Sequence, residues 1–210
     1  MVTNVSKKTG YTFINLRRQI PLNNFLTARG FHCVAYSKQS RINQFIMKAL
    51  GHTRFGGEDV IEWLDIPVPE ITGHDLRVKI HAVGINPVDV KVRTNWGGFG
   101  DLQNSNPVIS GWDAAGVVDA VGPNADGRFK PGDEVFFAGS VARQGHHREY
   151  SLVDSRVVGR KPASLSFTEA AALPLTSLTV WEGLIDNAGF SLDATGAPKK
   201  VLLVGGAGGV

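Results

Sequence analysis

The chain has 210 residues, of which 42% are hydrophobic and 20% are charged, a balance typical of a folded globular protein with a buried core. No apolar run approaches the roughly 20 residues that a membrane-spanning helix needs, which argues against insertion into a bilayer. A single cysteine, Cys33, excludes an internal disulfide framework and any multi-thiolate zinc site, and favours an intracellular setting.

The net charge of +3 comes from the first 46 residues, which carry seven Lys and Arg and no Asp or Glu. From Met47 onward the chain has 15 basic and 19 acidic residues, and no basic face with interleaved aromatic residues is evident. This part of the chain therefore gives no indication of a nucleic-acid partner.

Residues 1–46 have two interpretations. An Arg-rich segment without acids is typical of a mitochondrial transit peptide. The alternative, which we favour, is an unstructured upstream extension with the true start at Met47, and this predicts a cytoplasmic protein.

Short strands follow Met47. The sequence predicts a half-buried strand over residues 60–67, closed by prolines. Strict alternation over residues 75–85 predicts a second strand, with Leu76, Val78 and Ile80 on one face. Pro87 suits the first turn of a short helix that ends at Arg93.

Further strands are expected over residues 111–122, 134–138 and 149–158, separated by turns rich in glycine, proline and aspartate. The first of them is rich in Gly and Ala, which allows a backbone or ligand to approach closely. Together these patterns predict a compact, barrel-like antiparallel domain.

After Pro162 the apolar period changes from two to 3.6, which marks a domain boundary. Ser166 and Glu169 have the spacing of a capping box, so a helix is expected there. Pro174 should break it, with a second helix resuming near Ser177 and placing Leu178, Trp181 and Ile185 on one face. Four apolar residues, 201–204, then predict a buried parallel strand that enters a glycine-rich turn.

In that turn, Gly205, Gly206, Gly208 and Gly209 are the expected cofactor-binding residues. Without side chains they allow backbone N–H groups to approach a pyrophosphate, although a tight strand-to-helix turn alone would also account for them.

Six motifs in order resemble the medium-chain dehydrogenase/reductase superfamily, in particular its quinone oxidoreductase-like (zeta-crystallin-like) branch, often labelled "zinc-type alcohol dehydrogenase-like". They are MKALG from Met47, AVGINPVDVKVR at 82–93, GWDAAGVVDAVG at 111–122, PGDEVFFAG at 131–139, FTEAAALPLTSLTVWEGL at 167–184, and VLLVGGAGGV at 201–210.

The resemblance implies a mixed α and β fold: a GroES-like antiparallel β-barrel over residues 47–162, followed by the first helices and first strand of a truncated Rossmann (α/β doubly wound) domain at 163–210. It further implies a small-molecule substrate, NADP(H) in preference to NAD(H) as cofactor, no membrane partner, and homo-oligomeric full-length relatives.

The positions of the zinc ligands in zinc-dependent relatives correspond here to Asn86, Trp112 and approximately Leu175. None of the three is a good zinc ligand, so we expect no zinc.

Two residues are candidate catalytic groups. Asn86 could hydrogen-bond a substrate oxygen, or it could simply cap the helix at Pro87. Asp113 could orient the substrate or the nicotinamide ribose, although a solvated or salt-bridged turn acid is the simpler interpretation.

Thr176 could hold the cofactor amide, but we favour a role as N-cap of the second helix. Trp96 and Trp112 could line a substrate pocket, with core packing the alternative, particularly for Trp112. His146 and His147 are expected to be solvated, and His81 to contact solvent or a neighbouring strand.

The leading hypothesis is an NAD(P)H-dependent, zinc-independent oxidoreductase that transfers hydride to or from a quinone, enone or similar carbonyl compound, with this chain an incomplete and inactive form. The alternatives are a non-catalytic GroES-like fragment or interaction module, and a zinc-dependent alcohol dehydrogenase.

Overall fold

The computed structural model describes residues 2–8, 11–16, 27–28, 31–32, 45–96, 102, 104–193, 200–206, 208 and 210. The chain divides into two units, residues 1–43 and residues 44–210. In the first unit, β1 (Val2–Lys8) pairs with β2 (Tyr11–Leu16), and β3 (Thr27–Ala28) pairs with β4 (Phe31–His32), both antiparallel. Cys33 lies outside the described residues.

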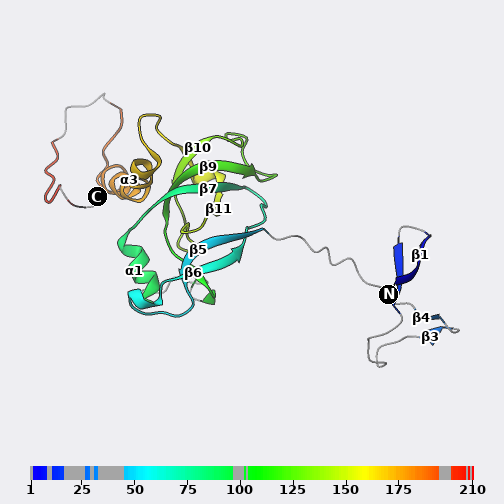
Figure 1. The fold of residues 1–210 in the computed structure, drawn as a ribbon. Coiled ribbons are helices and arrows are strands. Elements are labelled where there is room, and N and C mark those ends of the chain that lie inside the picture. The colour runs from blue at the N-terminus through cyan, green and yellow to red at the C-terminus, as the bar shows by residue number, and fades with distance from the viewer. Residues whose placement is uncertain are drawn as a thin grey trace. The chain divides into compact units, whose positions relative to one another are not determined.

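Two antiparallel sheets make up most of the second unit (Figure 1). The larger sheet has the order β11-β7-β9-β10-β12 and the smaller has the order β6-β5-β8. The larger sheet contains β7 (Asp75–Gly84), β9 (Asp113–Val121), β10 (Glu134–Ala138), β11 (Tyr150–Asp154) and β12 (Gly159–Arg160). The smaller contains β5 (Ile46–His52), β6 (Glu62–Pro67) and β8 (Val108–Ile109), and the short helices η2 (Glu58–Val60) and η4 (Ser155–Val157) precede β6 and β12. The mixed α and β class and the antiparallel strands are as predicted.

The alternation seen in the sequence of β7 sets the core. Leu76 and Val78 are fully buried, and Ile80 packs against the same cluster. Phe137 from β10 and Val153 from β11 belong to the same buried cluster. Because side chains alternate across a strand, Arg77 lies on the opposite face, where it pairs with Asp119 of β9.

Helices α1, α2 and α3 follow from local sequence signals. Helix α1 (Pro87–Arg93) has the predicted bounds, and α2 (Phe167–Ala171) begins at the predicted capping box of Ser166 and Glu169. Helix α3 (Pro174–Trp181) continues into a π-helical segment, η5 (Glu182–Asn187). The second helix was expected to resume near Ser177, but Pro174 occupies its first position, where the missing N–H has no intrahelical partner to lose.

Helix α2 packs on the larger sheet. Ala170 and Ala171 are buried against Ala115 of β9, and Phe136 and Phe167 lie beside them. Gly84 allows this approach, because a Cβ on it would lie 2.5 Å from the carbonyl oxygen of Ala171. The segment after Pro162 thus begins on the surface of the antiparallel domain.

One expectation for the C-terminal part was wrong. Val201–Val204 were expected to form a buried strand, but they are exposed and form no strand. A strand needs a neighbour for its backbone hydrogen bonds, and none lies beside this segment among the described residues. Leu178 and Trp181, which were expected on one helix face, are each about half exposed. Within the described part of the chain, no helix combines the length and apolar character needed to cross a membrane.

Candidate functional site

Asp113 connects three elements that are far apart in the sequence. It is the first residue of β9, and its Oδ2 accepts a hydrogen bond of 2.9 Å from Nδ2 of Asn86, the residue before α1. Its Oδ1 accepts a hydrogen bond of 2.8 Å from the backbone N–H of Leu175 at the start of α3. The three positions that the family resemblance assigns to zinc ligands thus lie at or next to a hydrogen-bond network centred on the Asp113 carboxylate.

The carboxyl group of Asp113 is buried, with 1% of the residue exposed. Burial is the largest influence on it and raises its pKa above the ordinary value, while the hydrogen bonds from Asn86 and Leu175 act in the opposite direction. The expectation of a solvated or salt-bridged acid was wrong, because Asp113 is paired with neutral donors in the interior.

Asn86 is half-buried and precedes Pro87, the first residue of α1. Its backbone N–H donates to Oδ2 of Asp89 at 2.7 Å and its backbone carbonyl accepts the N–H of Asp89 at 3.0 Å, and this pair of contacts closes the helix start. An amide nitrogen carries two hydrogens, and one of those on Asn86 is used by Asp113. The geometry is thus compatible with both predicted roles, since the helix is capped and one amide N–H remains for a substrate oxygen.

The other predicted site residues are spread out. Thr176 is not an N-cap: it lies inside α3, where its hydroxyl donates to the carbonyl of Leu173 at 2.9 Å. Trp112 is 1% exposed and packs with Val92 and Val108, so it belongs to the core and cannot line an open pocket. Trp96 is 66% exposed, with the Lys91 ammonium over its ring.

The glycine segment forms a turn. Gly205 has a φ of +74°, a left-handed conformation that favours glycine, and the N–H of Gly208 donates to the carbonyl of Gly205 at 2.8 Å. Gly206 is exposed, so its backbone is open to a ligand. These residues fit the approach of a diphosphate to the backbone, whereas the predicted contribution of Gly209 lies outside the described residues.

No grouping of three or more His, Cys, Asp or Glu suited to a metal occurs among the residues that the structure describes. At the predicted ligand positions the side chains are an amide, an indole and an aliphatic chain. This donor set does not fit zinc.

His146 and His147 are not solvated as expected. His146 is 2% exposed, its Nδ1 lies 2.6 Å from the Ser151 hydroxyl, and its ring meets Phe137 edge-on. Burial, followed by the nearby charges of Arg148 and Arg143, lowers the pKa of His146 to about 3. Burial also lowers the pKa of His147, which is partly buried. Sequence spacing carries no signal of this burial, because it results from the loop folding back on β8.

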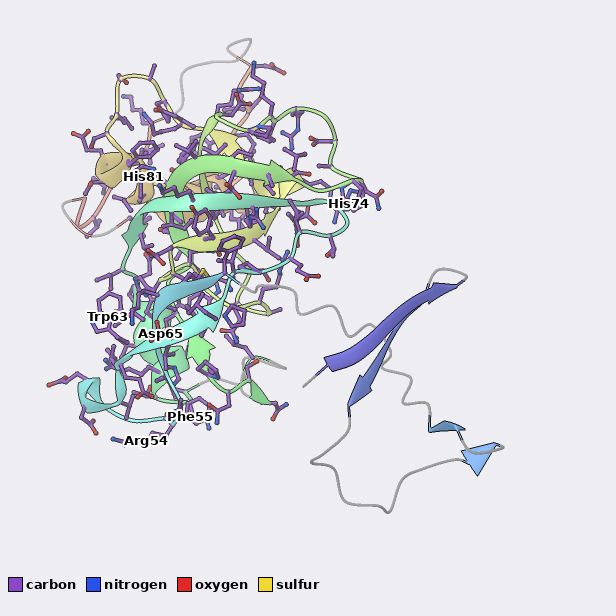
Figure 2. All side chains as sticks on the ribbon, turned by 45° about the vertical axis from the view of Figure 1, so that its right-hand side comes forward. Arg54, Phe55, Trp63, Asp65, His74 and His81 are labelled. Atoms are coloured by element: carbon purple, nitrogen blue, oxygen red, sulfur yellow. The ribbon has the colours of Figure 1, made fainter. Side chains whose placement is uncertain are left out.

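His81 is exposed and stacks on Phe167, with ring centroids 4.4 Å apart. This contact joins β7 to α2, and Figure 2 shows His81 on the surface there, away from Arg54 and Phe55 on the loop after β5. The backbone N–H of Leu175 was the member of the network that sequence analysis missed, since a backbone donor leaves no trace in residue identity.

Comparisons with known proteins identify the family of this chain. The model of the alcohol dehydrogenase GroES-like domain matches residues 72–179. The chain is 40% identical over 173 residues to 2-methylene-furan-3-one reductase of Solanum lycopersicum, covering 78% of this chain and 42% of that protein. It is 35% identical over 168 residues to the quinone oxidoreductase of Homo sapiens, covering 80% and 48%.

Among solved structures, a putative zinc-dependent alcohol dehydrogenase protein from Rhizobium etli CFN 42 is 46% identical with a TM-score of 0.62. That match covers 68% of this chain and 41% of the other. The chain spans about half the length of the curated relatives it matches. From the matched GroES-like domain and these relatives, the chain belongs to the medium-chain dehydrogenase/reductase superfamily, in its quinone oxidoreductase-like branch.

Proposed function

We propose that this chain provides the substrate-binding domain of an NAD(P)H-dependent, zinc-independent oxidoreductase that reduces a quinone, an enone or a similar carbonyl compound. The observation that carries the proposal is the Asn86–Asp113 hydrogen bond of 2.9 Å. It holds the Asn86 amide in one orientation at the position where zinc-dependent members of the superfamily place a metal ligand. The names of the tomato and human relatives, a furanone reductase and a quinone oxidoreductase, support this substrate class.

Asn86 acts on the substrate oxygen in this proposal. Its remaining amide N–H donates to the carbonyl oxygen, which becomes more negative as hydride arrives at the conjugated system. Asp113 is a positioning residue: its buried carboxylate fixes the amide and connects it to the start of α3. Because a hydrogen-bond donor performs the polarisation, the step needs no metal ion.

The nicotinamide cofactor, when bound, supplies the hydride. Gly205, Gly206 and Gly208 are the described residues whose exposed turn would hold its diphosphate; the N–H of Gly208 already donates to the carbonyl of Gly205, which leaves the backbone of Gly206 as the open donor. Thr176 would lie toward the amide end of the cofactor. NADP(H) in preference to NAD(H), a cytoplasmic location and a homo-oligomeric full-length protein are part of the same proposal.

The test compares two proteins. The 210-residue chain alone should show little NADPH affinity by titration calorimetry and no turnover, because its glycine turn is flanked by no strand or helix among the described residues. A chimera that joins residues 45–210 to the remaining part of the Rhizobium etli relative should consume NADPH with a benzoquinone or an enone. Metal analysis of the chimera should find no stoichiometric zinc.

Asn86→Ala in the chimera should lower kcat/KM by about 10- to 100-fold, the loss of one transition-state hydrogen bond. Thr94→Ala, on the exposed end of α1, is the control and should change it little. Full activity of the Asn86 variant, or zinc-dependent turnover, would refute the proposed role. An inactive but folded chimera would favour a non-catalytic GroES-like module.

A further inference from the structure

A pocket lies between the end of β5, the segment before β6, and α1. Its volume is about 270 Å³, and its apolar walls include Leu50, Ile61 and Val90. Asn86, Asp113 and Leu175 are not among its lining residues, although Asp89, which does line it, accepts the backbone N–H of Asn86. A pocket of this size suits a ligand with a single ring.

His52, at the end of β5, lines this pocket and has an unused acceptor. The residue is 2% exposed, and its Nδ1 lies 3.1 Å from the carbonyl oxygen of Arg54. Because a carbonyl can only accept, Nδ1 carries the proton and Nε2 of the neutral ring is an acceptor. Nε2 is buried and has no hydrogen-bond partner among the described residues.

Burial keeps this ring neutral. Burial is the largest influence on His52 and lowers its pKa below the ordinary value. The hydrogen bond to the Arg54 carbonyl raises the pKa, and the nearby charge of Arg93 lowers it. Near neutral pH the ring therefore offers Nε2 as an acceptor without a positive charge.

Arg93, the last residue of α1, lines the same pocket and has an unused donor. Its Nε is buried and has no acceptor among the residues described, while its backbone carbonyl accepts the N–H of Gly56 at 3.1 Å and anchors the loop after β5. A buried donor and a buried acceptor without partners are each unfavourable by about 1–3 kcal/mol. Two such groups lining one pocket indicate a ligand that satisfies both.

Asp89 restricts the charge of that ligand. It also lines the pocket, and its carboxylate oxygens already accept the N–H groups of Asn86 and Gly111, each at 2.7 Å. An anionic ligand would meet this carboxylate and would have no proton for His52. A hydroxyl group, by contrast, can donate to a histidine nitrogen and accept from a guanidinium.

We propose that this pocket binds a small neutral aromatic alcohol of the phenol class, with its ring against Leu50, Ile61 and Val90 and its hydroxyl toward His52 and Arg93. This binding is independent of the proposed reaction at Asn86. It requires only the antiparallel domain.

The test uses fluorine NMR of the 210-residue chain with two probes of matched shape. The first, para-fluorophenol, has a hydroxyl hydrogen, and the second, para-fluoroanisole, does not. The phenol should bind about 3- to 10-fold more tightly, the contribution of one hydrogen bond. His52→Leu should remove this preference, because it deletes the acceptor and keeps the apolar volume.

If the His52 variant does not fold, a second pair of variants tests the same binding. Val90→Trp fills the pocket from a half-exposed helix position and should abolish binding, whereas Val141→Trp, on an exposed loop outside the pocket, should leave it unchanged. Equal affinity for the two probes, binding that survives Val90→Trp, or no binding of the phenol at millimolar concentration would overturn the proposal.

Discussion

Replacing Asp113 by Asn tests the buried network directly. The substitution keeps the volume, but it turns one accepting oxygen into an NH2 group that faces either the Asn86 amide or the Leu175 N–H, which are 2.9 and 2.8 Å away. A hydrogen bond to a charged group contributes about 1.5–3 kcal/mol, part of which is offset because a charge is no longer buried. We expect a loss of about 2 kcal/mol at neutral pH, which lowers the urea midpoint by about 1 M if m is about 2 kcal/mol/M.

Asp119→Asn is the matched control, because it makes the same change on the same strand. Asp119 pairs with Arg77 near the surface, so its loss should amount to less than about 1 kcal/mol. Since burial raises the pKa of Asp113, the wild type gains stability by binding a proton as the pH falls through that raised pKa toward 3.8. The deficit of Asp113→Asn should therefore widen in acid. Equal urea midpoints for the two variants would refute the network.

Three further predictions concern the packing around this site. The pKa of His146 is lowered from 6.5 to about 3, so its contribution to the free energy of unfolding is present above pH 6.5 and is lost as the pH falls toward 3. In urea titrations across that pH range, His146→Gln should therefore lose less stability than the wild type. The control His81→Gln, at an exposed position, should lose as much as the wild type. Gly84→Ala should destabilise by about 1–3 kcal/mol in thermal unfolding, because its Cβ would meet a carbonyl of α2 at 2.5 Å, whereas Gly183→Ala, with open space, should not. Trp112→Phe deletes the indole N–H that donates to the carbonyl of Ser140 at 3.0 Å, and it should lower the free energy of unfolding in urea by about 1–2 kcal/mol. Trp96→Phe, at an exposed position, is the control. A similar loss for both variants would contradict the assignment of Trp112 to the core.

The sequence predicted those elements whose ends or buried faces are set by residues close together in the chain. The Asn86–Pro87 start of α1 and the Ser166–Glu169 capping box appear in the structure because a helix end is decided by residues three positions apart. The alternation in β7 identified its buried face for the same reason. Val201–Val204 were mispredicted because an apolar run specifies a strand only where a neighbouring strand accepts its hydrogen bonds.

The candidate site was predicted in part. Asn86 and Asp113 were recognised separately, but their hydrogen bond spans 27 positions and depends on β7 and β9 lying side by side. The burial of His146 and the pocket that joins His52 to Arg93 likewise had no sequence pattern. Each arises where a loop folds against a distant strand or helix.

By itself, the sequence determined the superfamily, the antiparallel domain and the residues unsuited to zinc, because motif order, alternation and side-chain identity are properties of the chain. Only the tertiary structure decided which polar groups are buried and which donor meets which acceptor. Burial changes the pKa of a carboxyl or an imidazole and makes an unpaired polar atom unfavourable. The roles of Asp113 and His52 therefore follow from their environment in the folded protein.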